Sequence, residues 1–146
     1  MNGSINGGTN WYQTLTGDTP DLYPIPSNTS KRVYYKASTP NYINFDVSED
    51  KIQISSASIL KDFADVVNAG GTTLNAELTG DINMSDVEIT VIGNSPTNAY
   101  KGTFDGNGYE INNYSLTIDG TFVASYGYGM FGNTNGATIK NFTIDL

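Results

Sequence analysis

The chain has 146 residues, a net charge of −8 and a composition rich in Gly and Tyr, which fits one small domain, alone or with an appendage. The acidic balance, with Arg32 as the single arginine, provides no basic patch for phosphates and argues against nucleic-acid binding. The absence of Cys and His excludes zinc and thiolate chemistry and a Ser-His-Asp triad, and no apolar run is long enough for membrane insertion.

Residues 2–30 have the composition of loops, with Asn-Gly and Gly-Gly pairs and several prolines. Short strands are predicted after them at 31–36, 42–47 and 51–54, and Ser48-Glu49-Asp50 is predicted to be a tight turn between the last two. Residues 1–54 are therefore expected to form an irregular N-terminal segment of loops and short strands.

Two aromatic residues, Trp11 and Tyr12, stand out in the loop-like segment. One interpretation is that their rings cover a hydrophobic surface of the protein. The other is that they form a platform on which sugar rings stack. We favour the first interpretation and keep both residues as candidate ligand-binding positions.

A helix is predicted over residues 55–68. Apolar residues recur there at helical spacing and form one stripe: Ile59, Leu60, Phe63, Val66 and Val67. Ser55 or Ser56 is a suitable N-cap, and the Gly70-Gly71 pair is expected to end the helix.

Strands are predicted next within residues 72–84 and at 88–92, and residues 100–146 then contain two copies of one unit. Residues 109–118 align without a gap on residues 137–146, at a separation of 28 residues. The alignment places Ile111 on Ile139, Asn113 on Asn141, Tyr114 on Phe142, Leu116 on Ile144 and Ile118 on Leu146. A Gly-x-Phe motif precedes each copy, at 102–104 and at 129–131.

Alternation of period two within each copy indicates strands, and self-similarity at this separation is typical of a solenoid. The asparagines at 113 and 141 suit corners, because Asn tolerates left-handed backbone. The sequence therefore predicts an all-β solenoid over residues 55–146, with the helical stripe capping the apolar end of the first coil. The alternative is that two unrelated strands of a β-sandwich match by chance.

Five motifs occur in a fixed order in this part of the chain. They are Val-Asn-Ala-Gly at 67–70, Ala-Glu-Leu-Thr-Gly-Asp-Ile-Asn-Met at 76–84, Gly-Thr-Phe-Asp-Gly-Asn-Gly at 102–108, Gly-Met-Phe-Gly at 129–132 and Ala-Thr-Ile-Lys-Asn-Phe-Thr-Ile at 137–144. This succession resembles the GLUG-type repeat domains of bacterial adhesin-like surface and secreted proteins. Met130 stands where the family has leucine in its Gly-Leu-hydrophobic-Gly motif.

The resemblance implies a right-handed parallel β-helix in a larger repeat protein, located on the cell surface or outside the cell. Residues 1–54 resemble the tail of a preceding repeat, so the chain reads as a piece of an array cut out of phase. We accordingly expect an open last coil near Leu146. Its partners would be other repeats of the same protein or another copy of the chain, with a host protein or a glycan as further candidates.

Asp105-Gly106-Asn107-Gly108 looks like part of a calcium loop, which makes Asp105 the one candidate metal ligand. The further acidic ligands of such a loop are missing, and a Gly-rich corner explains the motif as well. Glycoside hydrolysis needs two carboxylates on one face, for which Asp81, Asp105, Glu110 and Asp119 are candidates. Fifteen acidic residues make a chance pairing easy, so we expect no enzyme.

The segment 119–128 carries aromatic residues among small ones, including Tyr126 and Tyr128. It is either a packed extension or a recognition surface, and both tyrosines are candidate ligand-binding residues. The function expected from the sequence is a non-catalytic structural or adhesive module of a bacterial repeat protein. The alternative is a carbohydrate-binding or polysaccharide-cleaving β-helix domain.

Overall fold

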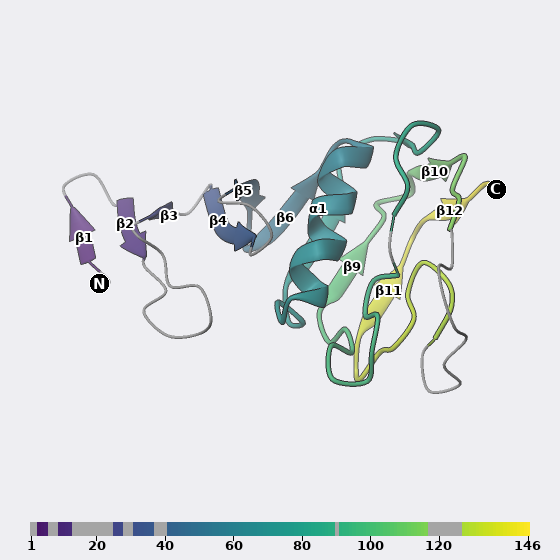
Figure 1. The fold of residues 1–146 in the computed structure, drawn as a ribbon. Helices are drawn as coiled ribbons and strands as arrows, with labels where there is room; N and C mark the ends of the chain where they lie inside the picture. Colours follow the sequence, from purple (N-terminus) through teal and green to yellow (C-terminus); the bar gives the residue numbers. More distant parts are fainter. Residues whose placement is uncertain are drawn as a thin grey trace. The chain divides into compact units, whose positions relative to one another are not determined.

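The computed structural model describes residues 3–5, 9–12, 25–27, 31–36, 41–89, 91–116 and 127–146. The chain divides into two compact units, Met1–Ile52 and Gln53–Leu146. Figure 1 labels the helix and most of the strands.

The first unit consists of antiparallel strands: β1 (Gly3–Ile5), β2 (Thr9–Tyr12), β3 (Ile25–Ser27), β4 (Lys31–Lys36) and β5 (Asn41–Ser48), followed by β6 (Lys51–Ile54), which runs on into the second unit. β1, β2 and β3 form one sheet, and β5 pairs with both β4 and β6. Glu49 and Asp50 have positive φ angles and form the predicted turn between β5 and β6. The predicted strands β4 to β6 are confirmed, whereas β1 to β3 lie where loops were predicted.

The second unit contains one helix and short parallel strands among its described residues. They are α1 (Ala57–Asn68), β7 (Asn75–Leu78), β8 (Ile82–Asn83), β9 (Thr103–Asp105), β10 (Glu110–Asn112), β11 (Thr138–Lys140) and β12 (Thr143–Ile144). No strand is described at the predicted 88–92 position, where Ile92 makes only a single bridge to Phe131.

The predicted fold class, an all-β right-handed parallel β-helix with a capping helix, is wrong. The chain is a small α/β protein that combines antiparallel strands, parallel strands and a helix. The antiparallel part arises because the two-residue turn at Glu49-Asp50 lets β5 fold directly back onto β6, which parallel strands cannot do through so short a connection. Parallel pairing is limited to strands β7 to β12.

The helix α1 begins and ends where the sequence predicts. Ser56 is the N-cap, and its side chain accepts a hydrogen bond from the Ile59 N–H at 3.3 Å. The chain leaves the helix through Gly70, whose φ of 114° strongly favours glycine. The apolar stripe is confirmed as the buried face, which consists of Leu60, Phe63, Ala64, Val66 and Val67.

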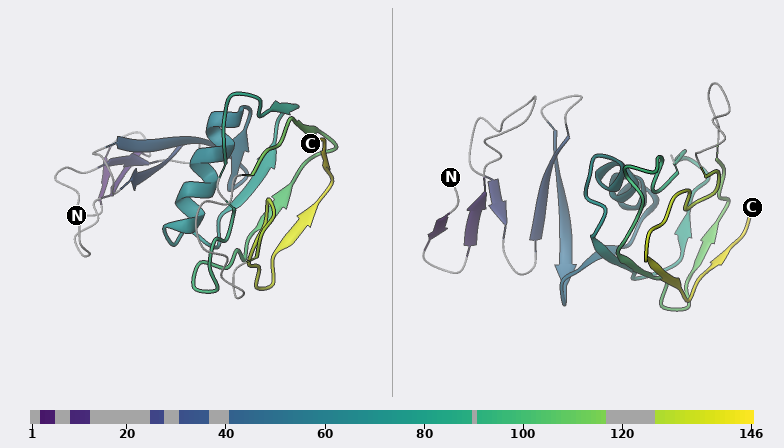
Figure 2. Two further views of the ribbon diagram at one scale, coloured as in Figure 1. Left: turned by 45° about the vertical axis from the view of Figure 1, so that its right-hand side comes forward. Right: turned by 90° about the horizontal axis from the view of Figure 1, so that it is seen from below.

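The parallel strands form two ladders, and the chain visits both ladders three times. We call these visits pass 1 (residues 75–83), pass 2 (103–112) and pass 3 (138–144). The first strands of the passes form the order β11-β9-β7, and the second strands form the order β12-β10-β8. Figure 2 shows β7, β9 and β11 as teal, green and yellow arrows that run side by side in one direction.

The register of the ladders differs from the predicted alignment. Ile139 lies beside Phe104, and Ile144 lies beside Ile111, at separations of 35 and 33 residues. The separation of 28 residues occurs one pass earlier, between Ala76 and Phe104. The gapless alignment fails because the connection from pass 2 to pass 3 is longer than the connection from pass 1 to pass 2, and connections tolerate length changes that ladders do not.

Aromatic side chains join the helix to the ladders. The ring of Phe63 on α1 lies 5.9 Å from that of Tyr100 and 6.0 Å from that of Phe104. The Phe104 ring in turn contacts those of Phe131 and Phe142, at 5.2 Å and 5.5 Å. Phe63, Tyr100 and Phe104 are fully buried, whereas Phe131 and Phe142 are half-buried, so the aromatic cluster runs from the helix to pass 3.

Candidate interaction surface

Pass 3 lies at the end of both ladders. The Thr138 N–H donates to the Gly102 carbonyl at 3.0 Å, and the Lys140 carbonyl accepts from the Gly106 N–H at 2.8 Å. Because backbone groups alternate in direction along a strand, the N–H and C=O of Ile139 point away from β9. No strand among the described residues pairs with this side of β11.

The second ladder ends in the same way. The Asp145 N–H donates to the Ile111 carbonyl at 2.9 Å, and the Thr143 N–H donates to the Tyr109 carbonyl at 3.3 Å. The backbone groups of Ile144 therefore point away from β10. We call the free sides of β11 and β12 together the β11/β12 edge.

Exposure of the apolar side chains changes abruptly at this edge. Ala76 and Phe104, in passes 1 and 2, are 0% exposed, but their neighbour in pass 3, Ile139, is 38% exposed. In the second ladder, Ile111 is 0% exposed and Ile144 is 37% exposed. Each inward position is buried when another pass follows it, so the exposed isoleucines mark an unfilled position of the ladder.

Amide and carboxylate side chains link consecutive passes. Between passes 1 and 2, Asn75 Oδ1 accepts from the Thr103 N–H, Asp81 Oδ1 accepts from the Glu110 N–H, Asn107 Nδ2 donates to the Leu78 carbonyl, and Asn113 Nδ2 donates to Asn83 Oδ1, all within 2.9–3.0 Å. These bonds hold the corners of neighbouring passes in register, in addition to the backbone ladders.

Asp105 links pass 2 to pass 3. Its Oδ1 accepts from the Asn107 N–H and from Asn141 Nδ2, both at 3.0 Å, and its Oδ2 lies 3.0 Å from the Lys140 ammonium. These hydrogen bonds, from Asn107 first, then from Asn141 and Lys140, lower the pKa of Asp105 from 3.8 to about 2. A metal ion bound by Asp105 would compete with the ammonium group for Oδ2, and among the described residues no group of three or more acidic side chains gathers around a common point.

The low pKa of Asp105 predicts an acid-sensitive link. A carboxylate whose pKa falls on folding stabilises the protein above its unfolded pKa of 3.8, and this contribution is lost as the pH falls towards about 2. We therefore expect Asp105→Asn to lower the urea midpoint at pH 6, and the difference from the unmodified chain to shrink between pH 4 and pH 2. Urea titrations followed by circular dichroism at these pH values test it. A difference that stays constant across the range would contradict it.

The predicted ligand-binding residues are not brought together by the described structure. Trp11 and Tyr12 lie in β2 of the first unit, and their side chains are outside the description. Tyr126 lies outside the described residues, and Tyr128 in the second unit is half-buried. Their role in sugar binding remains a prediction.

The acidic residues considered for hydrolysis serve different purposes. Asp81 and Asp105 accept hydrogen bonds that link passes, Glu110 lies in β10, and Asp119 is outside the described residues. Sequence reasoning missed the linking role of Asp81, Asn75, Asn83 and Asn107. Their spacing carried a signal, because each lies 28–30 residues from its partner.

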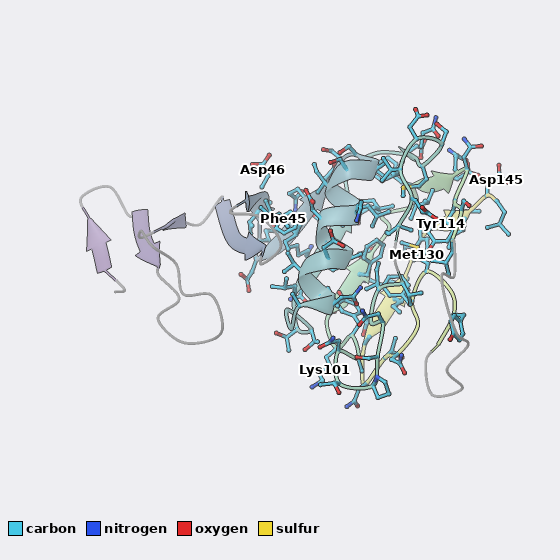
Figure 3. The ribbon with its side chains drawn as sticks, viewed as in Figure 1. Phe45, Asp46, Lys101, Tyr114, Met130 and Asp145 are labelled. Carbon is cyan, nitrogen blue, oxygen red and sulfur yellow. The ribbon has the colours of Figure 1, made fainter. Side chains whose placement is uncertain are left out.

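Tyr114 is a second buried group close to pass 3. Its N–H donates to the Asp145 carbonyl at 3.1 Å, and Figure 3 shows both residues at one end of the second unit. Its hydroxyl is buried and has no hydrogen-bond partner among the described residues. Burial raises the pKa of Tyr114 to about 12, so the hydroxyl stays neutral.

The one helix of the described residues has 12 residues, and none is long and apolar enough to cross a membrane. Comparison of the chain with protein-family models, with curated proteins and with solved structures finds no match in any of the three.

Proposed function

We propose that the chain is a non-catalytic structural or adhesive module of a bacterial cell-surface or secreted repeat protein. The sequence resemblance to GLUG-type repeat domains motivates this proposal. The observation that supports it best is the link between consecutive passes: equivalent residues lie side by side in two parallel ladders, and polar side chains tie the corners together.

The chemistry of the polar groups fits a structural role. In an enzyme, carboxylates converge on a cleft and have shifted pKa values suited to proton transfer near neutral pH. Here the carboxylate of Asp105 is held ionised by three donors of the protein, and that of Asp81 accepts a backbone N–H. These groups spend their hydrogen-bonding capacity on joining passes, which favours a stiff scaffold.

The partner that the proposal requires binds at the β11/β12 edge. Exposed strand edges recruit further strands, and natural proteins usually cover them or add a strand. Other repeats of the same protein, or another copy of the chain, are the partners expected here. A spacer or adhesive module of this kind would work outside the cell or at its surface.

Binding and activity assays test the proposed function. A glycan array probed with the 146-residue chain, and a reducing-sugar assay on mixed polysaccharides, should both give no signal above background. Release of reducing ends would overturn the non-catalytic proposal. Glycan binding that Trp11→Ala or Tyr128→Ala abolishes, with the circular dichroism spectrum unchanged, would establish the carbohydrate-binding alternative instead.

A further inference from the structure

We propose that the β11/β12 edge accepts a fourth pass, supplied by another repeat segment, and that this segment carries an acidic residue opposite Lys140. The inference rests on the proposed function and names the partner's chemistry. The surface comprises the free backbone groups of Ile139 and Ile144, their exposed side chains and the half-buried rings of Phe131 and Phe142.

The three existing passes define what a fourth would look like. Each pass has an apolar residue followed by a charged one in its first strand: Ala76-Glu77, Phe104-Asp105 and Ile139-Lys140. Each has isoleucine followed by Asn or Asp in its second strand: Ile82-Asn83, Ile111-Asn112 and Ile144-Asp145. Four to six residues separate the two apolar positions. A segment with this pattern would place its apolar residues beside Ile139 and Ile144.

Charge selects among such segments. Lys140 pairs with Asp105 on one side, yet its side chain is 48% exposed and its other side faces the edge. An oppositely charged residue on a neighbouring strand is favoured and a like charge is disfavoured. The occupant's first strand should therefore carry Asp or Glu at this position, as passes 1 and 2 do.

A second copy of the chain fits this requirement less well. Within its described residues, strands β9 and β10 already have a partner on each side. A second copy could present the same β11/β12 edge, whose charged first-strand residue is lysine rather than an acid. Charge complementarity thus favours an acidic repeat segment over self-association.

The test supplies a fourth pass in the same chain. A copy of residues 101–113, which contains pass 2, is joined after Leu146 through 19 Gly/Ser residues, the number between Asn83 and Thr103. Hydrogen–deuterium exchange of the peptide covering residues 137–146 is compared with that of the unfused chain. We expect the Ile139 and Ile144 amides to exchange at least about tenfold more slowly in the fusion.

Two matched fusions control the chemistry. One carries Phe104→Asn and Ile111→Asn in the appended copy, and the other carries only Asp105→Lys there. The first should give no protection, and the second should give clearly less than the unmodified copy. Equal protection from all three fusions would show that the linker alone acts, and it would overturn the inference.

The remaining outcomes are also decisive. If the unmodified fusion gives no protection, the edge does not accept a parallel pass, although the glycan and reducing-sugar results that test the proposed function would stand. If the unfused chain already protects these amides in a concentration-dependent manner and light scattering detects a dimer, a second copy occupies the edge. That result would overturn the choice of partner.

Discussion

Replacing Phe104 with alanine should destabilise the second unit by about 3–5 kcal/mol. The Phe104 ring is fully buried and contacts the rings of Phe63, Phe131 and Phe142, so its removal leaves a cavity between the helix and pass 3. The helical circular dichroism signal in urea measures the effect, because among the described residues the only helix, α1, belongs to the second unit.

Phe142→Ala is the matched control for this variant. It removes the same ring from the same cluster, but the Phe142 side chain is half-buried, so we expect a loss of about 1 kcal/mol. Equal losses from the two variants would show that the cluster does not become more exposed towards pass 3, contrary to the structure.

Replacing Gly102 with alanine should cost about 3 kcal/mol, although it adds a single methyl group. A Cβ at Gly102 would lie 2.1 Å from the Leu74 carbonyl oxygen and 2.8 Å from the Tyr100 hydroxyl. Backbone cannot move aside as a flexible side chain can. The hydrogen bond from Tyr100 to the Leu74 carbonyl, 2.8 Å long, would be disturbed as well. The urea midpoint of the helical signal is again the measurement.

Gly80→Ala is the control, because a Cβ there meets nothing within 4 Å and its φ is not positive. This change should be neutral or stabilise the chain by about 0.4–1 kcal/mol, since alanine restricts the unfolded state. If Gly102→Ala were as harmless as Gly80→Ala, the close approach of the two passes at Leu74 would be wrong.

The glycine comparison also shows what the sequence could not predict. Gly102 and Gly129 open the two Gly-x-Phe motifs and appear equivalent in the sequence. In the structure, a Cβ at Gly129 would meet only the Phe131 carbonyl, at an ordinary 3.6 Å. The residue that continues the ladder beyond the Thr103–Thr138 pair, at the level of Gly102, is Ala137. The motif repeats, but the close contact does not.

Periodicity and caps predicted the helix well, because both are local properties of the sequence. The left-handed backbone of Asn113 and Asn141, with φ of 55° and 62°, was likewise predictable from residue type. Their partners were not: Asn113 bonds to Asn83, and Asn141 bonds to Asp105, rather than lying over one another. Register depends on the lengths of the connections, which the alternation of strands does not encode.

The edge itself was anticipated only in part. Apolar alternation around Ile139 and Ile144 predicted that these residues face inward, but their remaining exposure depends on what covers pass 3. The fold class was wrong because the antiparallel pairing of the first unit was not weighed against the repeat. A repeat in one part of a chain constrains that part alone.

The spacing of the passes has a kinetic consequence. Every ladder contact of the second unit joins residues 28–35 positions apart, so each requires the closure of a loop of nearly the same size. Loop-closure entropy over this range differs by only about 0.2 kcal/mol, which gives no pass an advantage in the search for its neighbour. The order of assembly is then decided by burial, and we infer that passes 1 and 2 condense around α1 while pass 3, which hides the least apolar surface, joins last.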